Sequence, residues 1–243
     1  MTQEREDRLY AANMEKITDF VFDERVVRVF SDMVRRSVPG YATLLSMLPV
    51  IVRCFVSAGS RCYDLGCSQG ACTLAIRHSL QHEDVSIIAV DNSPSMVASC
   101  REQVAQDHGR APVETVCEDV TVTDIVNASL VVMNFTLQFI EPGQRPELLR
   151  RIYQGLNPGG ALLLSEKIRL DEKEARLMTA LHEEFKRANG YSELEISQKR
   201  SALENVLVTE SLQEHKQHLH DAGFSQVVVW FQCFNFVSLL AVK

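Results

Sequence analysis

The chain has 243 residues, of which 46% are hydrophobic and 23% charged, values that are ordinary for a folded protein and exclude intrinsic disorder. Its length suits one α/β domain with a full core, so we expect residues 1–243 to form a single domain. The net charge of −7 gives no general attraction for phosphate backbones or anionic membranes, so direct binding to nucleic acid or membrane is not expected.

The first eight residues mix acidic and basic side chains without an apolar core, so they do not resemble an export signal. The longest apolar stretch, Leu44 to Val52, is interrupted by Pro49 and is shorter than the roughly 20 residues of a membrane span. The seven cysteines are odd in number and several fall in apolar runs, which indicates reduced thiols. We therefore expect a cytoplasmic protein.

No metal site is predicted. Three cysteines repeat at a five-residue spacing that suits neither zinc nor an iron–sulfur cluster. His215, His218 and His220 are interpreted as a solvated helix face, because positions 218 and 220 diverge around a helix.

Residues 1–56 are predicted to form a helical extension, because apolar residues recur at helical spacing from Phe22 onward and are interrupted only at Pro39-Gly40. The first strand, residues 61–65, runs into a glycine-rich turn, and a helix begins near Ala71.

Strands and helices then alternate. Further strands are predicted at 85–90, 113–117, 130–135 and 161–165, with helices beginning at Ser93-Pro94 and covering 146–154. These strands are continuous apolar runs, which is typical of a parallel sheet covered by helices on both faces.

The chain ends with two strands, 226–231 and 236–242, close enough to pair antiparallel at a sheet edge. A charged helical insertion, about 171–216, precedes them. The predicted fold is therefore α/β, a doubly wound, mostly parallel seven-stranded sheet with a Rossmann-like core at 57–243.

Ligands of open parallel sheets bind at the carboxyl ends of the strands. In the turn after the first strand, Gly66, Cys67 and Ser68 lead to Gly70. Ser68 stands where a dinucleotide fingerprint has its second glycine, and no P-loop lysine follows, so a phosphate ligand is disfavoured. A sulfonium nucleoside fits better, because Asp64 suits its positive charge.

Polar residues follow the next three strands as well. Asp91, with Asn92, could accept hydrogen bonds from both hydroxyls of a ribose. Asp119 could accept one from an adenine amino group, beside the apolar Val120, and Asn134 follows the fourth strand. Each alone could be a helix cap or loop residue, but four such positions at consecutive strand ends indicate one ligand site.

These motifs resemble those of class I S-adenosylmethionine (SAM)-dependent methyltransferases, in order. They are residues 63–68 (YDLGCS), 90–94 (VDNSP), 134–139 (NFTLQF) and 156–160 (LNPGG). Longer runs, at 22–26, 36–41, 185–193 and 230–236, closely resemble the carboxy-S-adenosyl-L-methionine synthase family. This second resemblance covers nearly the whole chain.

The resemblance implies an enzyme that transfers the carboxylate lost from prephenate onto the SAM methyl group, giving carboxy-S-adenosyl-L-methionine (carboxy-SAM) and phenylpyruvate. SAM would be the substrate, carboxy-SAM a bound product, and no metal would take part. It also implies a homodimer, and a separate tRNA carboxymethyltransferase that uses the product for the 5-oxyacetyl modification of wobble uridine.

The resemblance further implies which residues bind SAM. They are Tyr41, Gly66, Cys67, Ser68, Asp91, Asn92, Asp119, Val120, Asn134 and Arg200. Tyr41 and Arg200 would also be catalytic. From the residues alone, Tyr41 merely follows a Pro-Gly turn, and Arg200 belongs to a surface pair with Lys199.

A guanidinium binds a carboxylate by two parallel hydrogen bonds, so Arg200 would hold the new carboxylate, reaching in from the neighbouring subunit. Arg35, Arg36 and Lys199 are further cations for prephenate, with no choice among them. Two alternatives stay open: an ordinary small-molecule methyltransferase, and a non-catalytic SAM-binding scaffold for a tRNA-modifying partner.

Overall fold

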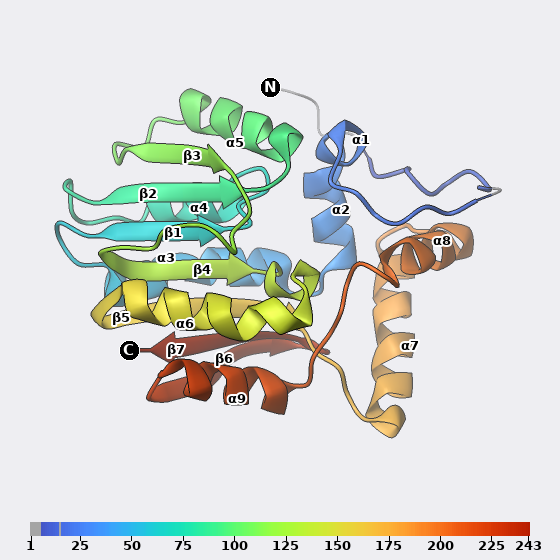
Figure 1. The fold of residues 1–243 in the computed structure, drawn as a ribbon. Coiled ribbons are helices and arrows are strands. Elements are labelled where there is room, and N and C mark those ends of the chain that lie inside the picture. The colour runs from blue at the N-terminus through green and yellow to red at the C-terminus, as the bar shows by residue number, and fades with distance from the viewer. Residues whose placement is uncertain (1–5, 15) are drawn as a thin grey trace.

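The computed structural model describes residues 6–14 and 16–243, which surround a seven-stranded sheet of order β3-β2-β1-β4-β5-β7-β6 (Figure 1). The strands are β1 (Arg61–Leu65), β2 (Ser86–Asp91), β3 (Val113–Cys117), β4 (Ala128–Asn134), β5 (Leu156–Lys167), β6 (Gln226–Cys233) and β7 (Phe236–Val242). The first five are parallel, and β7 runs antiparallel between β5 and β6. The predicted doubly wound fold is confirmed, and its topology switches where β1 lies between β2 and β4.

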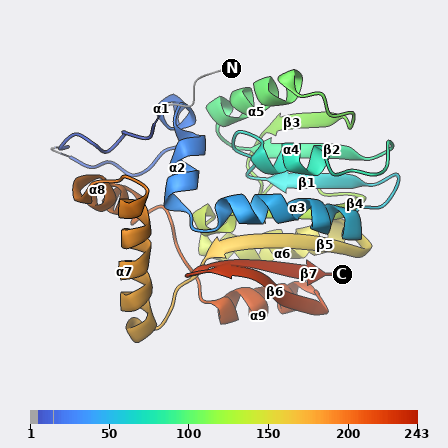
Figure 2. The same cartoon turned by 180° about the vertical axis from the view of Figure 1, so that it is seen from behind.

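Helices cover both faces of the sheet (Figures 1 and 2). They are α3 (Tyr41–Phe55), α4 (Ala71–Arg77), α5 (Pro94–Gln106), α6 (Arg145–Gly155) and α9 (Leu212–Ala222). On one face, Leu48 of α3 and Ile76 of α4 pack with strand residues such as Ile87. On the other, Ile152 of α6 and Leu219 of α9 complete a second cluster. Burial of both clusters fixes the strand ends on which a ligand site depends.

A roof of four helices lies beyond the carboxyl ends of the parallel strands (Figures 1 and 2). It consists of α1 (Glu24–Val27), α2 (Phe30–Ser37), α7 (Glu172–Ala188) and α8 (Glu193–Leu203). Short 3₁₀ turns at Leu137–Phe139 and Pro142–Gln144 follow β4. The predicted insertion at about 171–216 thus supplies α7 and α8, whereas α9 packs on the sheet with α6.

Two local predictions are wrong. Pro49 does not interrupt its apolar stretch, because α3 runs through it from Tyr41 to Phe55. His215 is not solvated, since only 1% of its surface is exposed, and burial lowers the pKa of its ring to about 4. In the described residues no single helix is long and apolar enough to span a membrane, and only α2 and α3, bent by 98°, pass that test as a pair.

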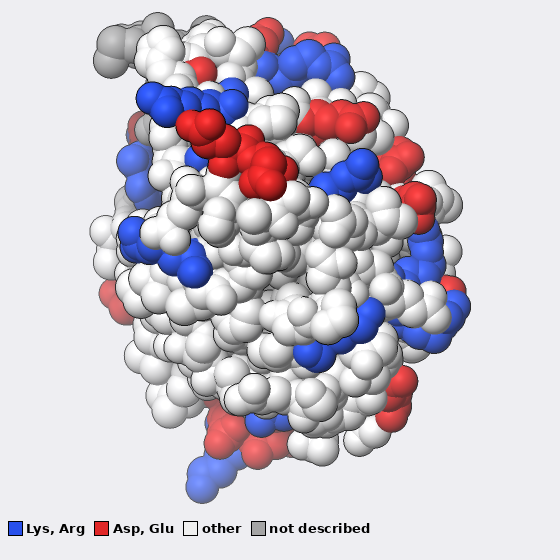
Figure 3. Space-filling model, turned by 90° about the vertical axis from the view of Figure 1, so that its left-hand side faces the viewer, with Lys and Arg blue, Asp and Glu red and all other residues white. Residues whose placement is uncertain are grey.

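The opposite side of the molecule, at the amino ends of the parallel strands, carries basic and acidic side chains in mixture, separated by wide uncharged areas (Figure 3). No continuous basic surface is seen on the part of this face that the structure describes. On this face, the described residues therefore form no basic surface that could attract a phosphate backbone against the net charge of −7.

Candidate active site

One cavity of about 1050 Å³ lies between the carboxyl ends of the strands and the roof. This volume is at the upper end of the roughly 300–1,000 Å³ of ligand pockets, so the cavity has room for more than one small molecule. All ten residues predicted to bind SAM line it: Tyr41, Gly66, Cys67, Ser68, Asp91, Asn92, Asp119, Val120, Asn134 and Arg200. The structure therefore brings the whole predicted set together, from the ends of four strands with the turns that follow them and from the two helices α3 and α8.

The glycine-rich turn after β1 brings backbone to the cavity wall. Gly66 has a left-handed φ of +83°, and a Cβ atom there would collide with the side chain of Thr136, so only glycine fits. The amides of Gly66 and Cys67 both donate to the carbonyl of Val90, at 2.8 and 2.9 Å. These bonds hold the turn on the end of β2.

Asp91 ends β2 with its carboxylate almost fully buried. Its two oxygens accept hydrogen bonds of 2.9 Å from the backbone amides of Ser68 and Ser93. Because each carboxylate oxygen has two lone pairs, acceptor sites remain for a pair of ribose hydroxyls. The exposed Asn92 lines the cavity beside it.

The loop after β3 places a second carboxylate at the rim. Oδ1 of Asp119 accepts bonds of 2.8 and 2.7 Å from the backbone amide and the hydroxyl of Thr121. Those two bonds orient the side chain and leave Oδ2 available to a donor such as an adenine amino group. Val120 is buried next to it and offers an apolar surface.

Asn134, at the end of β4, carries the clearest sign of a missing partner. Its amide nitrogen lies 3.5 Å from the sulfur of Cys72, but its buried Oδ1 has no hydrogen-bond partner among the described residues. Buried acceptors are rarely left unpaired in folded proteins. An ammonium group in the cavity would satisfy Oδ1, so these residues fit the amino acid part of SAM.

Asp64 strengthens that fit. Its carboxylate is buried and accepts a 2.6 Å hydrogen bond from the hydroxyl of Thr73. Burial raises the pKa of this carboxyl to about 6, so it is still charged at neutral pH. Burial also raises the pKa of Tyr41, which keeps that hydroxyl neutral.

The neighbouring residues Lys199 and Arg200 differ in their exposure to solvent. The interpretation of the two as a surface pair is therefore wrong for Lys199, which is buried. Lys199 is 5% exposed, and its ammonium lies 2.9 Å from the hydroxyl of Ser37 and 3.3 Å from a carboxylate oxygen of Asp7. The side chain of Arg200 is 59% exposed, lines the cavity and pairs with Glu183.

Lys167, His182 and Lys186 are among the cavity residues that sequence reasoning missed. Burial lowers the pKa of His182 to about 3 and that of Lys186 to about 7. Of the cations considered for prephenate, Arg35 and Lys199 line the cavity, whereas Arg36 points elsewhere and bonds to Asp32.

Comparisons with known proteins agree with this geometry. A methyltransferase domain model matches residues 63–160. Curated carboxy-S-adenosyl-L-methionine synthases of Escherichia coli and Escherichia fergusonii are each 53% identical to the chain over 238 residues, which is 98% of the chain and 96% of each relative. The chain belongs to the carboxy-S-adenosyl-L-methionine synthase family.

Solved structures show how widely this fold is shared. A putative O-methyltransferase of Nostoc punctiforme has a TM-score of 0.64 at 15% identity, with 90% of the chain and 59% of that protein covered. A putative SAM-dependent methyltransferase of Methanococcus maripaludis has a TM-score of 0.61 at 22% identity, with 95% and 97% covered. The synthase family thus shares the fold of class I SAM-dependent methyltransferases, and membership makes the chain a SAM-dependent transferase.

Proposed function

We propose that the chain converts SAM and prephenate to carboxy-SAM and phenylpyruvate. The observation that carries this proposal is a single cavity in which the strand ends suited to SAM face a cationic roof that includes Arg200. An ordinary methyl transfer needs only SAM and an oriented nucleophile, whereas a reaction between SAM and a carboxylic acid needs cations for its carboxylates.

The reaction balances without a further reagent. Prephenate loses carbon dioxide and hydroxide to become phenylpyruvate, the SAM methyl group loses a proton, and the resulting carbon forms a bond to carbon dioxide. Proton and hydroxide combine to water. The roles of the chain are to hold the two substrates together, to keep water out and to stabilise the new carboxylate.

Within this proposal, Arg200 binds the new carboxylate and Tyr41 lies beside it as the second catalytic residue. Arg200 lines the cavity of its own chain, yet its side chain is 59% exposed and able to extend elsewhere. A homodimer in which this arginine also serves the neighbouring cavity is part of the proposal.

The test is turnover by the purified chain with SAM and prephenate, followed by mass spectrometry. We expect a product about 44 mass units above SAM, because the reaction adds carbon dioxide. Arg200→Leu should lower the rate by about 100-fold or more, as loss of one charge-stabilising group does. Arg176→Leu, on an exposed part of α7, is the matched control and should leave the rate unchanged.

Other outcomes select other functions. Methylation of an acceptor that is insensitive to Arg200→Leu would identify an ordinary methyltransferase, and bound SAM without turnover would identify a scaffold. We further propose that the chain acts in the cytoplasm and supplies carboxy-SAM to a separate tRNA carboxymethyltransferase. The net charge of −7 supports the proposal that the chain does not bind tRNA itself.

A further inference from the structure

The roof side of the cavity contains a cluster of ammonium groups that the SAM site does not use. Lys167 ends β5, Lys186 lies on α7, and Lys199 lies on α8, and all three line the cavity. Lys199 is paired with Asp7. In the part of the chain that the structure describes, Lys167 and Lys186 make no side-chain hydrogen bond and no ion pair with a carboxylate.

These lysines are held close enough to disfavour one another's charge. Burial, and then the neighbouring Lys167 and Lys199, lowers the pKa of Lys186 to about 7. Burial, and then Arg200, lowers the pKa of Lys167. Lys167 and Lys186 are partly buried in the cavity wall. Charges withdrawn from water are stabilised by a partner of opposite sign, so a cluster of this kind indicates a site whose anion comes from a ligand.

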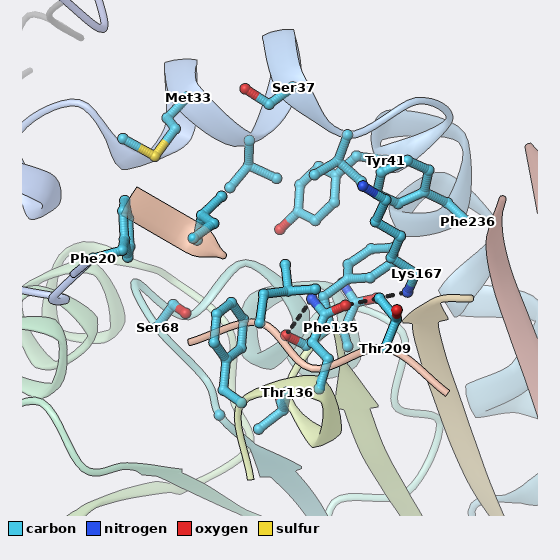
Figure 4. Close-up of a pocket in the computed structure, with 18 of the residues that line it drawn as sticks. Phe20, Met33, Ser37, Tyr41, Ser68, Phe135, Thr136, Lys167, Thr209 and Phe236 are labelled. Carbon is cyan, nitrogen blue, oxygen red and sulfur yellow. Dashed lines mark hydrogen bonds between the residues drawn. The ribbon is translucent and has the colours of Figure 1, made fainter. Parts of the chain in front are cut away.

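Beside the ammonium groups runs a row of aromatic rings. The ring centroids of Tyr41 and Phe135 lie 6.5 Å apart, and those of Phe135 and Phe236 lie 5.9 Å apart. The Lys167 ammonium lies 5.8 Å from the centroid of Phe236. Figure 4 shows these four side chains in the same pocket. The row therefore leads from the predicted SAM site to the lysines.

Phe135 occupies its place at some cost. Its φ of +63° is in the left-handed region that non-glycine residues rarely adopt, and its backbone amide donates a 2.7 Å bond to the carbonyl of Ser165. Strain of this kind persists where the surrounding structure enforces it, and it is concentrated at ligand sites. The conformation keeps the ring in the cavity.

We propose that Lys167 and Lys186 bind the carboxylates of the second substrate, a cyclic dicarboxylic acid whose ring packs on Phe135 and Phe236. The inference rests on the proposed function, which names this acid as prephenate. Only one of its carboxylates leaves, as carbon dioxide, and the other remains on phenylpyruvate. The lysine that binds the remaining carboxylate must therefore also contribute to binding of this product.

The test compares Lys167→Met and Lys186→Met with Lys173→Met, an exposed lysine of α7 that does not line the cavity. Each cavity variant should raise the KM for prephenate by about 10- to 100-fold, as loss of a buried charge partner does. The KM for SAM should stay within about twofold, because the SAM site is retained. At least one variant should weaken inhibition by phenylpyruvate in parallel.

A KM for prephenate within about twofold of the unmodified chain in both cavity variants would overturn the inference. Retained SAM binding shows that a variant has folded, and Lys186→Arg should recover part of the affinity if charge is what matters. If the unmodified chain does not turn over prephenate, the proposed function fails separately. In that case, equilibrium binding of phenylpyruvate to the SAM-loaded protein tests the anion site by itself. Binding that is weakened by Lys167→Met or Lys186→Met would support the site, and absence of binding would exclude it.

Discussion

Asp64 makes SAM binding sensitive to pH. The carboxyl group has a pKa of about 6 in the structure, with burial as the main cause and the neighbouring Asp91 adding to it. Below this pH the carboxyl is protonated and cannot attract the ammonium or sulfonium charge of SAM; above it the carboxylate is charged. SAM affinity should therefore weaken as the pH falls through about 6 and stay level above it.

Calorimetric titration of SAM from about pH 5 to pH 8 measures this directly. Asp64→Asn should lower the affinity about tenfold at neutral pH, the cost of one charge-assisted hydrogen bond, and remove most of the pH dependence. Asp84→Asn, at an exposed site, should behave like the unmodified chain. An affinity that does not change with pH in the unmodified chain would contradict the assignment of Asp64.

The pKa of Lys186 predicts that the reaction with prephenate depends on pH in the opposite direction to SAM binding. Its pKa is about 7, and it faces Lys167 from β5, Lys199 from α8 and, on its own helix, the neutral His182. As the pH rises through about 7 the free protein loses this positive charge, so kcat/KM for prephenate should fall. Lys186→Arg, whose guanidinium stays protonated, should move that fall to higher pH; an unchanged profile would exclude Lys186 as its source.

At the scale of elements, the amino-terminal segment fastens the roof. The buried carboxylate of Asp7 accepts a 2.6 Å bond from the hydroxyl of Tyr191 and pairs with Lys199 of α8. Its backbone amide donates a 2.8 Å bond to Asp32 of α2. The segment thus connects α2, in the amino-terminal half of the roof, to α8, the helix that carries Arg200.

Removing this carboxylate should loosen the roof. Asp7→Ala leaves Lys199 buried without its partner, so the free energy of unfolding should fall by about 3 kcal/mol. Urea denaturation measures the change. Adding Lys199→Met to Asp7→Ala should restore part of the lost stability, because it removes the uncompensated charge. If this double variant were less stable than Asp7→Ala, loss of the ion pair would not be the cause of the destabilisation.

The sheet was predictable from the sequence because its signals are local. Parallel strands buried on both faces are continuous apolar runs, and the strand 113–117 was predicted with the bounds of β3. The strand ends then gave the polar residues of the predicted SAM site. The helix α9 carried a readable signal that was missed: His215, Leu219 and Ala222 recur at helical spacing and share one buried face.

The roof was not predictable in the same way. Lys186 lies in a helix rich in charged residues, which predicts a solvated surface. Its partial burial arises only when α7 covers the ends of strands far away in the chain. Lys167 is the last residue of β5, a strand that was predicted to end two residues earlier. Such residues become a site through tertiary packing, for which one sequence has no local signal.

At the scale of the whole molecule, a ligand that joins strand ends to roof should stabilise the entire fold. SAM at about 100 times its dissociation constant should add about 2.7 kcal/mol to the free energy of unfolding. Thermal denaturation followed by circular dichroism should show this as a higher midpoint. Phe135→Ala, which leaves the strand-end carboxylates intact, should retain most of this increase, whereas Asp91→Ala should lose most of it.

The two sides of the cavity come from separate parts of the chain. The strand-end side lies within residues 63–160, the stretch that matches a general methyltransferase domain, and the roof comes from the segments before and after it. The predicted SAM-binding residues from Gly66 to Asn134 lie outside the roof segments, so substitutions in the roof leave these residues unchanged. In evolution, a lineage could therefore exchange one reaction of SAM for another by altering the flanking segments alone, and the same division offers a route to engineered enzymes with new acceptors.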